Sequence, residues 1–138
     1  MRRVTQISRS LALVTLLGAS LVLGGCGDYS GDIEGREYES TEVRGHELVE
    51  GSTIIMTFEE GRVSARAGCN TLNGAATWDD GTLEVAEPLA STMMACDEAL
   101  MEQDQWLSEF LTSGPAIEID GDTVTLGDDA NGITLSAL

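Results

Sequence analysis

The stretch "RVSARAGCNTLNG", Arg62–Gly74, carries the pattern that decides the fold. From its start to Cys69, small or apolar residues alternate with polar ones, which is typical of a β-strand with one buried face. The preceding "STIIMTF" alternates in the same way, and "EEGR" around Gly61 supplies a turn between the two. We therefore predict a β-hairpin with Cys69 on its buried face and Asn70 directed to the opposite one.

Further hairpins follow along the chain. "NGAATW" and "TLEV" flank a "DDG" turn, and Asp-Gly between alternating runs is the strongest short-range hairpin signal. Near the C-terminus "AIEI", "TVTL" and "ITLSAL" are joined at "DGD" and "GDDANG". The residues predicted to face inward from these last three strands are Ile117, Ile119, Val124, Leu126, Ile133 and Leu135. Because each pairing is local, the sheet is predicted to be antiparallel.

One segment, "CDEALMEQDQWLSEFLTSGP", breaks the alternation and predicts a helix from Glu98 to Thr112. Asp97 is its expected N-cap, and Gly114-Pro115 ends it. Its apolar stripe is formed by Leu100, Leu107, Phe110 and Leu111. Trp106, beside the stripe, is interpreted as a packing residue.

These elements define the expected fold class, which is α+β but mainly β. We predict a curved antiparallel sheet of about seven to nine strands, similar to a small barrel. One amphipathic helix is inserted before the last three strands.

The N-terminus has the pattern of an export signal. Three arginines in "MRRVTQISRS" precede the apolar run "LALVTLLGASLVL", which is too short for a comfortable membrane span of roughly 20 residues. "LGGC", Leu23–Cys26, resembles the lipobox of bacterial lipoproteins. We therefore predict that residues 1–25 are a lipoprotein signal peptide. The alternative is an ordinary signal peptide that leaves Cys26 as a free thiol.

Lipidation of Cys26 would set the location of the protein. A diacylglyceryl thioether with acyl chains such as palmitate anchors a chain stably to a membrane, whereas one acyl chain does not. We expect the protein on the extracytoplasmic face of the cell membrane, with residues 26–35 as a flexible acidic tether and residues 36–138 as the folded domain. The membrane is then its first partner, through the lipid on Cys26.

The net negative charge of the chain excludes nucleic acid as a class of partner. The chain holds 24 acidic residues against 7 basic ones, for a formal net charge of −17, and it has no lysine. Such a surface is repelled by nucleic acid and by anionic lipid headgroups. We therefore expect no nucleic-acid partner.

The cysteine count favours a disulfide between Cys69 and Cys96. Once Cys26 is lipidated, two of the three cysteines remain, in an oxidising compartment. A bond between them would stabilise the fold by about 3.5 kcal/mol in the chain-entropy treatment. Three alternatives stay open: a nucleophile paired with His46, a zinc ligand, or two free buried thiols.

Two motifs resemble a known family. "AGCNTLNG" at Ala67–Gly74 and "STMMAC" at Ser91–Cys96, followed by the acidic helix, resemble the META domain (HslJ-like) family over residues 36–138. The resemblance implies a small β-rich domain, often exported or lipid-anchored, with a bond between Cys69 and Cys96. It implies no established catalytic activity, and some members are associated with stress responses.

The function expected from these observations is a non-enzymatic binding or envelope-stress module without cofactor, metal ligands or catalytic residues. Its partner would be an envelope protein or a small ligand. Aspartate pairs in the sequence coincide with predicted turns, where Asp and Gly are common, rather than with calcium-loop spacing.

Two other functions are alternatives to this binding or envelope-stress module. One is a carrier that holds a small apolar ligand in a barrel-like cavity lined by Met56, Phe58, Met94 and Leu126. The other is an enzyme, which would require several acidic residues and His46 to converge in a cleft.

Overall fold

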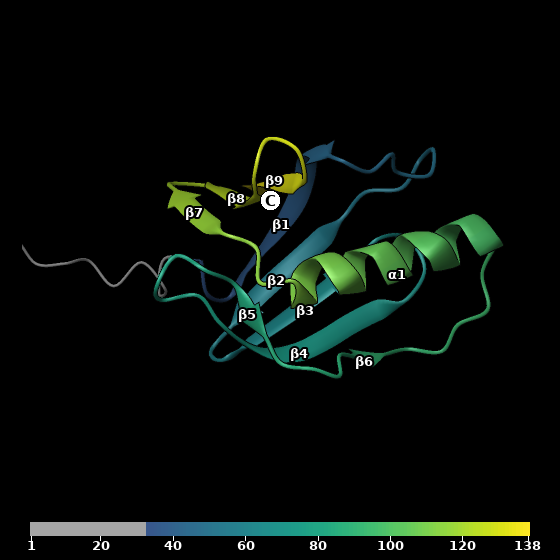
Figure 1. The fold of residues 1–138 in the computed structure, drawn as a ribbon, viewed down its shortest axis with the longest axis horizontal. Coiled ribbons are helices and arrows are strands. Elements are labelled where there is room, and N and C mark those ends of the chain that lie inside the picture. Colours follow the sequence, from purple (N-terminus) through teal and green to yellow (C-terminus); the bar gives the residue numbers. More distant parts are fainter. Residues whose placement is uncertain (1–32) are drawn as a thin grey trace, which may run out of the picture.

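The computed structural model describes residues 33–138, which form a curled antiparallel sheet and one helix (Figure 1). The helix, α1, runs from Glu98 to Thr112, the range predicted. The strands are β1 (Arg36–Arg44), β2 (Ile55–Glu59), β3 (Arg62–Arg66), β4 (Thr71–Thr77), β5 (Glu84–Val85), β6 (Ala90–Ser91), β7 (Ile117–Asp120), β8 (Thr123–Gly127) and β9 (Gly132–Ala137). The predicted fold class is confirmed, with α1 inserted directly before the last three strands.

The sheet consists of two meanders joined side by side. Its order is β5-β4-β3-β2-β1-β9-β8-β7, and the short β6 pairs with β4. The two ends of this order approach each other, because Leu83 N–H donates to the Pro115 carbonyl at 2.8 Å and Ile117 N–H donates to the Gly81 carbonyl at 3.0 Å. The sheet thus curls into a half-barrel.

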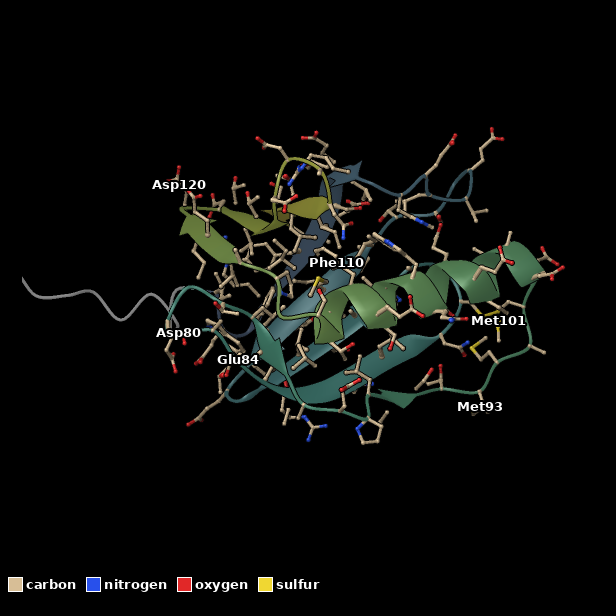
Figure 2. All side chains as sticks on the ribbon, in the orientation of Figure 1. Asp80, Glu84, Met93, Met101, Phe110 and Asp120 are labelled. Carbon is tan, nitrogen blue, oxygen red and sulfur yellow. A yellow bond between two sulfur atoms is a disulfide. The ribbon has the colours of Figure 1, made fainter. Side chains whose placement is uncertain are left out.

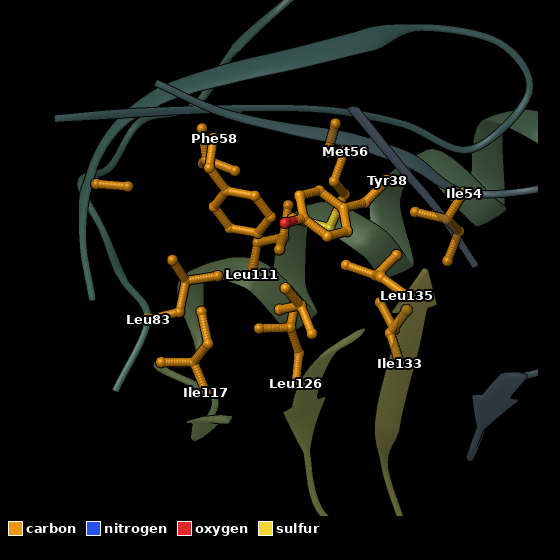
Figure 3. Close-up of a cluster of buried hydrophobic side chains, with 14 of the residues drawn as sticks. Tyr38, Ile54, Met56, Phe58, Leu83, Leu111, Ile117, Leu126, Ile133 and Leu135 are labelled. Atoms are coloured by element: carbon orange, nitrogen blue, oxygen red, sulfur yellow. The ribbon is translucent and has the colours of Figure 1, made fainter. Parts of the chain in front are cut away.

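The core lies between α1 and the concave face of this sheet (Figure 3). Side chains from both meanders and from α1 are fully buried there, among them Tyr38, Phe58, Leu107, Leu111, Leu126 and Leu135. The inward residues predicted for the last three strands are buried, except that Ile119 is only half-buried. The period-two pattern therefore identified the core face of these strands correctly.

The packed part of the chain begins earlier than residue 36. Ile33, which the sequence placed in the tether, is fully buried in the core. Gly35 N–H also donates to the Phe58 carbonyl at 2.8 Å. The predicted signal peptide and Cys26 lie outside the described residues.

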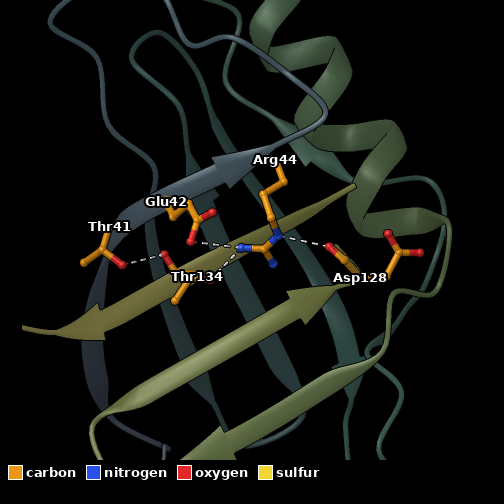
Figure 4. Close-up of polar contacts among 5 residues, drawn as sticks. All are labelled: Thr41, Glu42, Arg44, Asp128 and Thr134. Atoms are coloured by element: carbon orange, nitrogen blue, oxygen red, sulfur yellow. Dashed lines mark hydrogen bonds and ion pairs between the residues drawn. The ribbon is translucent and has the colours of Figure 1, made fainter. Parts of the chain in front are cut away.

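An arginine joins the two meanders at the end of β1 (Figure 4). Arg44 Nε donates to the Asp128 carbonyl at 3.0 Å, and its Nη1 donates to Thr134 Oγ1 at 2.8 Å. Glu42 lies 3.5 Å from the same guanidinium. This contact holds the β8–β9 hairpin against the end of β1, where Arg44 lies opposite Gly132.

The Asp128 side chain shapes the turn of that hairpin. Its Oδ1 accepts the N–H groups of Ala130 and Asn131, each at 2.8 Å. These two bonds, with a smaller contribution from Arg44, hold the pKa of Asp128 below its ordinary value. The "GDDANG" aspartate therefore has a structural role in a turn, as the sequence indicated.

Candidate binding groove

A disulfide joins the connection between β3 and β4 to the residues just before the helix. Cys69 and Cys96 are bonded, with their Cα atoms 6.2 Å apart and a separation of 27 positions in the sequence. The predicted pairing is confirmed. With both sulfurs in this bond, neither cysteine serves as the nucleophile, zinc ligand or free thiol that remained as alternatives.

The face predicted for Cys69 was wrong. Strand β3 ends at Arg66, and Gly68 has a φ of +114°, a conformation that L side chains rarely adopt. This residue interrupts the alternation, so Cys69 is only half-buried while Asn70, predicted to face outward, is 4% exposed.

Asn70 is the centre of a buried hydrogen-bond network. Its backbone N–H and its Nδ2 both donate to Asp104 Oδ2, at 2.8 and 3.0 Å. Its Oδ1 accepts from the Thr92 hydroxyl at 3.0 Å and from the Met94 N–H at 2.8 Å. One side chain thus holds together the start of β4, the segment after β6 and α1.

Gln103, beside Asp104 on α1, makes a second set of contacts. Its Oε1 accepts the Val49 N–H at 2.6 Å, and its Nε2 donates to Ser52 Oγ at 2.8 Å and to the Ala67 carbonyl. The loop between β1 and β2 is therefore fixed to the helix by a side chain that is 1% exposed.

The burial of Gln103 and Asp104 was not predicted from the sequence, although a signal was present. Leu100, Leu107 and Leu111 are spaced as one face of a helix, and Gln103 and Asp104 fall on that same face between them. Polar residues within an apolar stripe are buried only where they have hydrogen-bond partners. Asn70 in the "GCN" motif is one such partner.

A groove lies above this network, between α1 and the segment that follows β6. We call it the methionine groove. Its volume is about 570 Å³, and it is lined by Asn70, Leu72, Ser91, Thr92, Met93, Met94, Ala95, Met101, Asp104, Gln105, Ser108 and Glu109. Met93, Met94 and Met101 are 94%, 59% and 43% exposed. Figure 2 shows Met93 on the extended segment and Met101 on α1, at the same end of the molecule.

The carrier cavity expected from the sequence does not form as described. Met56, Phe58 and Leu126 have no exposed surface and pack in the core, whereas Met94 lies outside it in the methionine groove. The four side chains therefore do not line a common cavity. The physical reason is the position of the "STMMAC" segment, whose start pairs with β4 as an antiparallel strand and whose methionines line the groove beside α1.

Trp106 packs as predicted. Its indole is half-buried and stacks on the His46 imidazole, with ring centroids 4.1 Å apart and planes at 9°. On its other side it contacts Phe110, with centroids 5.8 Å apart. The histidine is thus part of an aromatic stack on α1.

Among residues 33–138 we find no cluster of three or more His, Cys, Asp or Glu side chains arranged to hold a metal ion. In the same part of the chain, no helix has the length and apolar character needed to cross a membrane.

The curled antiparallel sheet, the single covering helix and the disulfide at the start of that helix define a small half-barrel domain. The chain belongs to the META domain family, whose profile matches residues 31–137.

Two solved structures share this fold. One, described as the NMR structure of a protein, has a TM-score of 0.61 and 22% identity, and the match covers 78% of this chain and 92% of the other. The second, an NMR structure of a protein from Burkholderia xenovorans, has a TM-score of 0.59 and 16% identity, with 98% and 99% covered. No curated protein matches the chain.

Proposed function

We propose that this protein is a lipid-anchored, extracytoplasmic META-domain module of the cell envelope that binds a segment of another envelope protein in the methionine groove. The proposal assigns it no catalytic residues, cofactor or metal, and no nucleic-acid partner. A role in the envelope stress response fits the associations of some family members.

The observation that carries the proposal is the concentration of exposed methionines in one groove. The exposed large hydrophobic residues of the described chain are Met93, Met94, Met101 and Leu138, and the three methionines line the same groove. Contiguous exposed apolar surface marks interaction sites in soluble domains. Methionine side chains adapt to different partners, because they are unbranched and polarisable.

The rigidity beneath the groove supports the same conclusion. The disulfide and the Asn70–Asp104 hydrogen bonds fix the backbone on both sides of the groove. A rigid floor with mobile apolar side chains loses little backbone entropy when a partner binds. We infer a polypeptide segment as the partner because the groove lies along an extended strand segment and a helix, and so offers a long surface.

The lipid anchor is tested by the intact mass of the protein purified from membranes. We expect a chain that begins at Cys26, is heavier by a diacylglyceryl group, and accepts two alkyl groups only after reduction. A chain that begins elsewhere, or a Cys26 that alkylates without reduction, would contradict the anchor.

The groove is tested by selecting a displayed library of random dodecapeptides on the purified full chain. The enriched peptides are then added to protein carrying ¹³C-methyl methionine. We expect shifts of the Met93, Met94 and Met101 signals, while the signal of Met56, which is fully buried, stays in place and serves as the internal control. A library that enriches no such peptide would contradict the proposed function.

A further inference from the structure

We propose that the methionine groove recognises a lysine side chain of the bound segment, and that the ammonium group is received by Asp104. This inference rests on the proposed function and names the chemistry of its partner. It follows from one carboxylate oxygen on the floor of the groove, from the side chain that covers it and from the charge around it.

Only one of the two oxygens of the Asp104 carboxylate accepts hydrogen bonds. The residue is 6% exposed and lines the groove, and its Oδ2 accepts both donors of Asn70. Its Oδ1 is buried and has no hydrogen-bond partner among the described residues. A buried carboxylate oxygen without a donor is unfavourable, and native proteins pair nearly all such groups. A ligand that brings a donor to this oxygen therefore gains more than it would at an exposed carboxylate.

Met101 covers the network that holds this carboxylate. Its Sδ lies 3.7 Å from Asn70 Nδ2 and 3.9 Å from Cys69 Sγ, and it is three residues before Asp104 on the same helix face. Its side chain is 43% exposed and has three rotatable bonds, so rotation away from Asn70 requires no backbone movement. Because Asp104 Oδ1 is buried in the free protein, a partner reaches it by displacing this flexible side chain.

The charge of the groove favours a cation. Glu109 also lines it, with its carboxylate held by Gln105 Nε2 at 2.9 Å. The arginines of the described chain are Arg36, Arg44, Arg62 and Arg66, and none of them lines the groove. A positively charged segment therefore meets two acidic residues and no cation, on a chain whose formal net charge is −17.

The geometry distinguishes lysine from arginine. A guanidinium pairs best with a carboxylate through two parallel hydrogen bonds, which need both oxygens. Here Oδ2 is already occupied by Asn70, so a single oxygen is free. The compact ammonium of lysine, carried on a flexible apolar stem, matches one oxygen at the floor of a methionine-lined groove.

The decisive variant is Asp104→Asn. Because both donors of Asn70 face the Oδ2 position, the new amide must place its oxygen there and its NH₂ at the Oδ1 position. The variant keeps the contacts that hold the fold but replaces the free acceptor with a donor. Circular dichroism and thermal unfolding verify that it is folded.

The probe is a lysine-containing peptide from the selection, compared with the same peptide carrying norleucine or arginine in place of lysine. We expect D104N to bind the lysine peptide at least about 30-fold more weakly, as is typical when a buried charge pair loses one partner. The norleucine peptide should bind both proteins equally and weakly. The rim variant Glu109→Gln should weaken the lysine peptide by less than about threefold.

The outcomes separate the two proposals. Two outcomes would overturn this inference without contradicting the groove as a binding site. One is that the groove-binding peptides contain no lysine. The other is that the lysine peptide binds D104N and the unchanged protein with equal affinity. Should D104N fail to fold, the peptide series on the unchanged protein decides, because equal affinity of the lysine and norleucine peptides overturns the inference. A selection that yields no groove-binding peptide overturns both proposals.

Discussion

The inner face of α1 changes character halfway along its length. Toward its C-terminal end, Leu107, Phe110 and Leu111 are buried in the apolar core. Toward its N-terminal end, Gln103 and Asp104 are buried just as deeply, but against backbone groups and Asn70. Figure 2 places Phe110 and Met101 at opposite ends of the helix. One end of α1 thus stabilises the sheet by hydrophobic burial, while the other positions the loops and segments that form the groove.

The difference shows how a small domain separates stability from recognition. Hydrophobic burial is non-directional, so the apolar end tolerates some adjustment of its neighbours. Hydrogen bonds are directional, so the polar end specifies where the segment after β6 lies relative to α1. The disulfide is placed at this polar end, where apolar burial contributes least.

The largest loss of folding stability is expected from a substitution at the apolar, C-terminal end of α1. Phe110→Ala should lower the free energy of unfolding by about 3–5 kcal/mol, because it removes a ring that is 4% exposed and leaves a cavity between helix and sheet. Urea unfolding followed by circular dichroism measures this. Glu102→Ala, at an exposed position of the same helix, is the control and should change the value by less than about 0.5 kcal/mol. A loss for Phe110→Ala as small as that of the control would show that hydrophobic burial does not hold this end of α1.

The next largest loss of folding stability is expected when the disulfide is removed. Replacing Cys69 and Cys96 together by alanine should cost about 3.5 kcal/mol, since the bond closes a loop of 27 residues. Guanidinium unfolding with and without reductant measures this, and the variant should no longer respond to reductant. An unfolding midpoint that reductant leaves unchanged in the unmodified protein would show that the bond adds no stability.

Asn70→Ala tests the polar end of α1. The free energy of unfolding should fall by about 2–3 kcal/mol, because Asp104 and the Met94 N–H both lose a buried partner. Hydrogen exchange of the Met94 amide should accelerate, since the segment after β6 loses its attachment. Thr92→Ala, which removes the donor to Asn70 Oδ1 and the acceptor of the Thr71 N–H, should cost about 0.5–1.5 kcal/mol. Equal losses in the two variants would mean that the side-chain contacts of Asn70 with Asp104 and with the Met94 N–H contribute nothing.

The sequence predicted the two ends of α1 unequally well. Helix bounds, hairpins and the apolar core followed from local periodicity, because each depends on neighbours in the chain. The Asn70–Asp104 contact depends on how α1 packs against the connection between β3 and β4, which no local pattern contains. The prediction for Cys69 failed at Gly68, because a single positive φ reverses the faces of the residues that follow. The groove was missed because Met94 was assigned to a cavity inside the barrel, whereas it lines a groove beside α1.

The smallest effect on stability is expected at Asp128, whose carboxylate is exposed, in contrast to the buried Asp104. Hydrogen bonds from the N–H groups of Asn131 and Ala130 lower the pKa of Asp128 in the folded protein. Its contribution to stability is therefore fully present above its unfolded pKa of about 3.9 and is lost as the pH falls through the lower, folded pKa. Asp128→Asn should slightly lower the thermal midpoint near pH 7, and the difference from the unchanged protein should shrink as the pH falls below the unfolded pKa of about 3.9. Scanning calorimetry of both proteins across this range measures it. A difference that persists at the acidic end would mean that the charge of Asp128 is not what stabilises the turn.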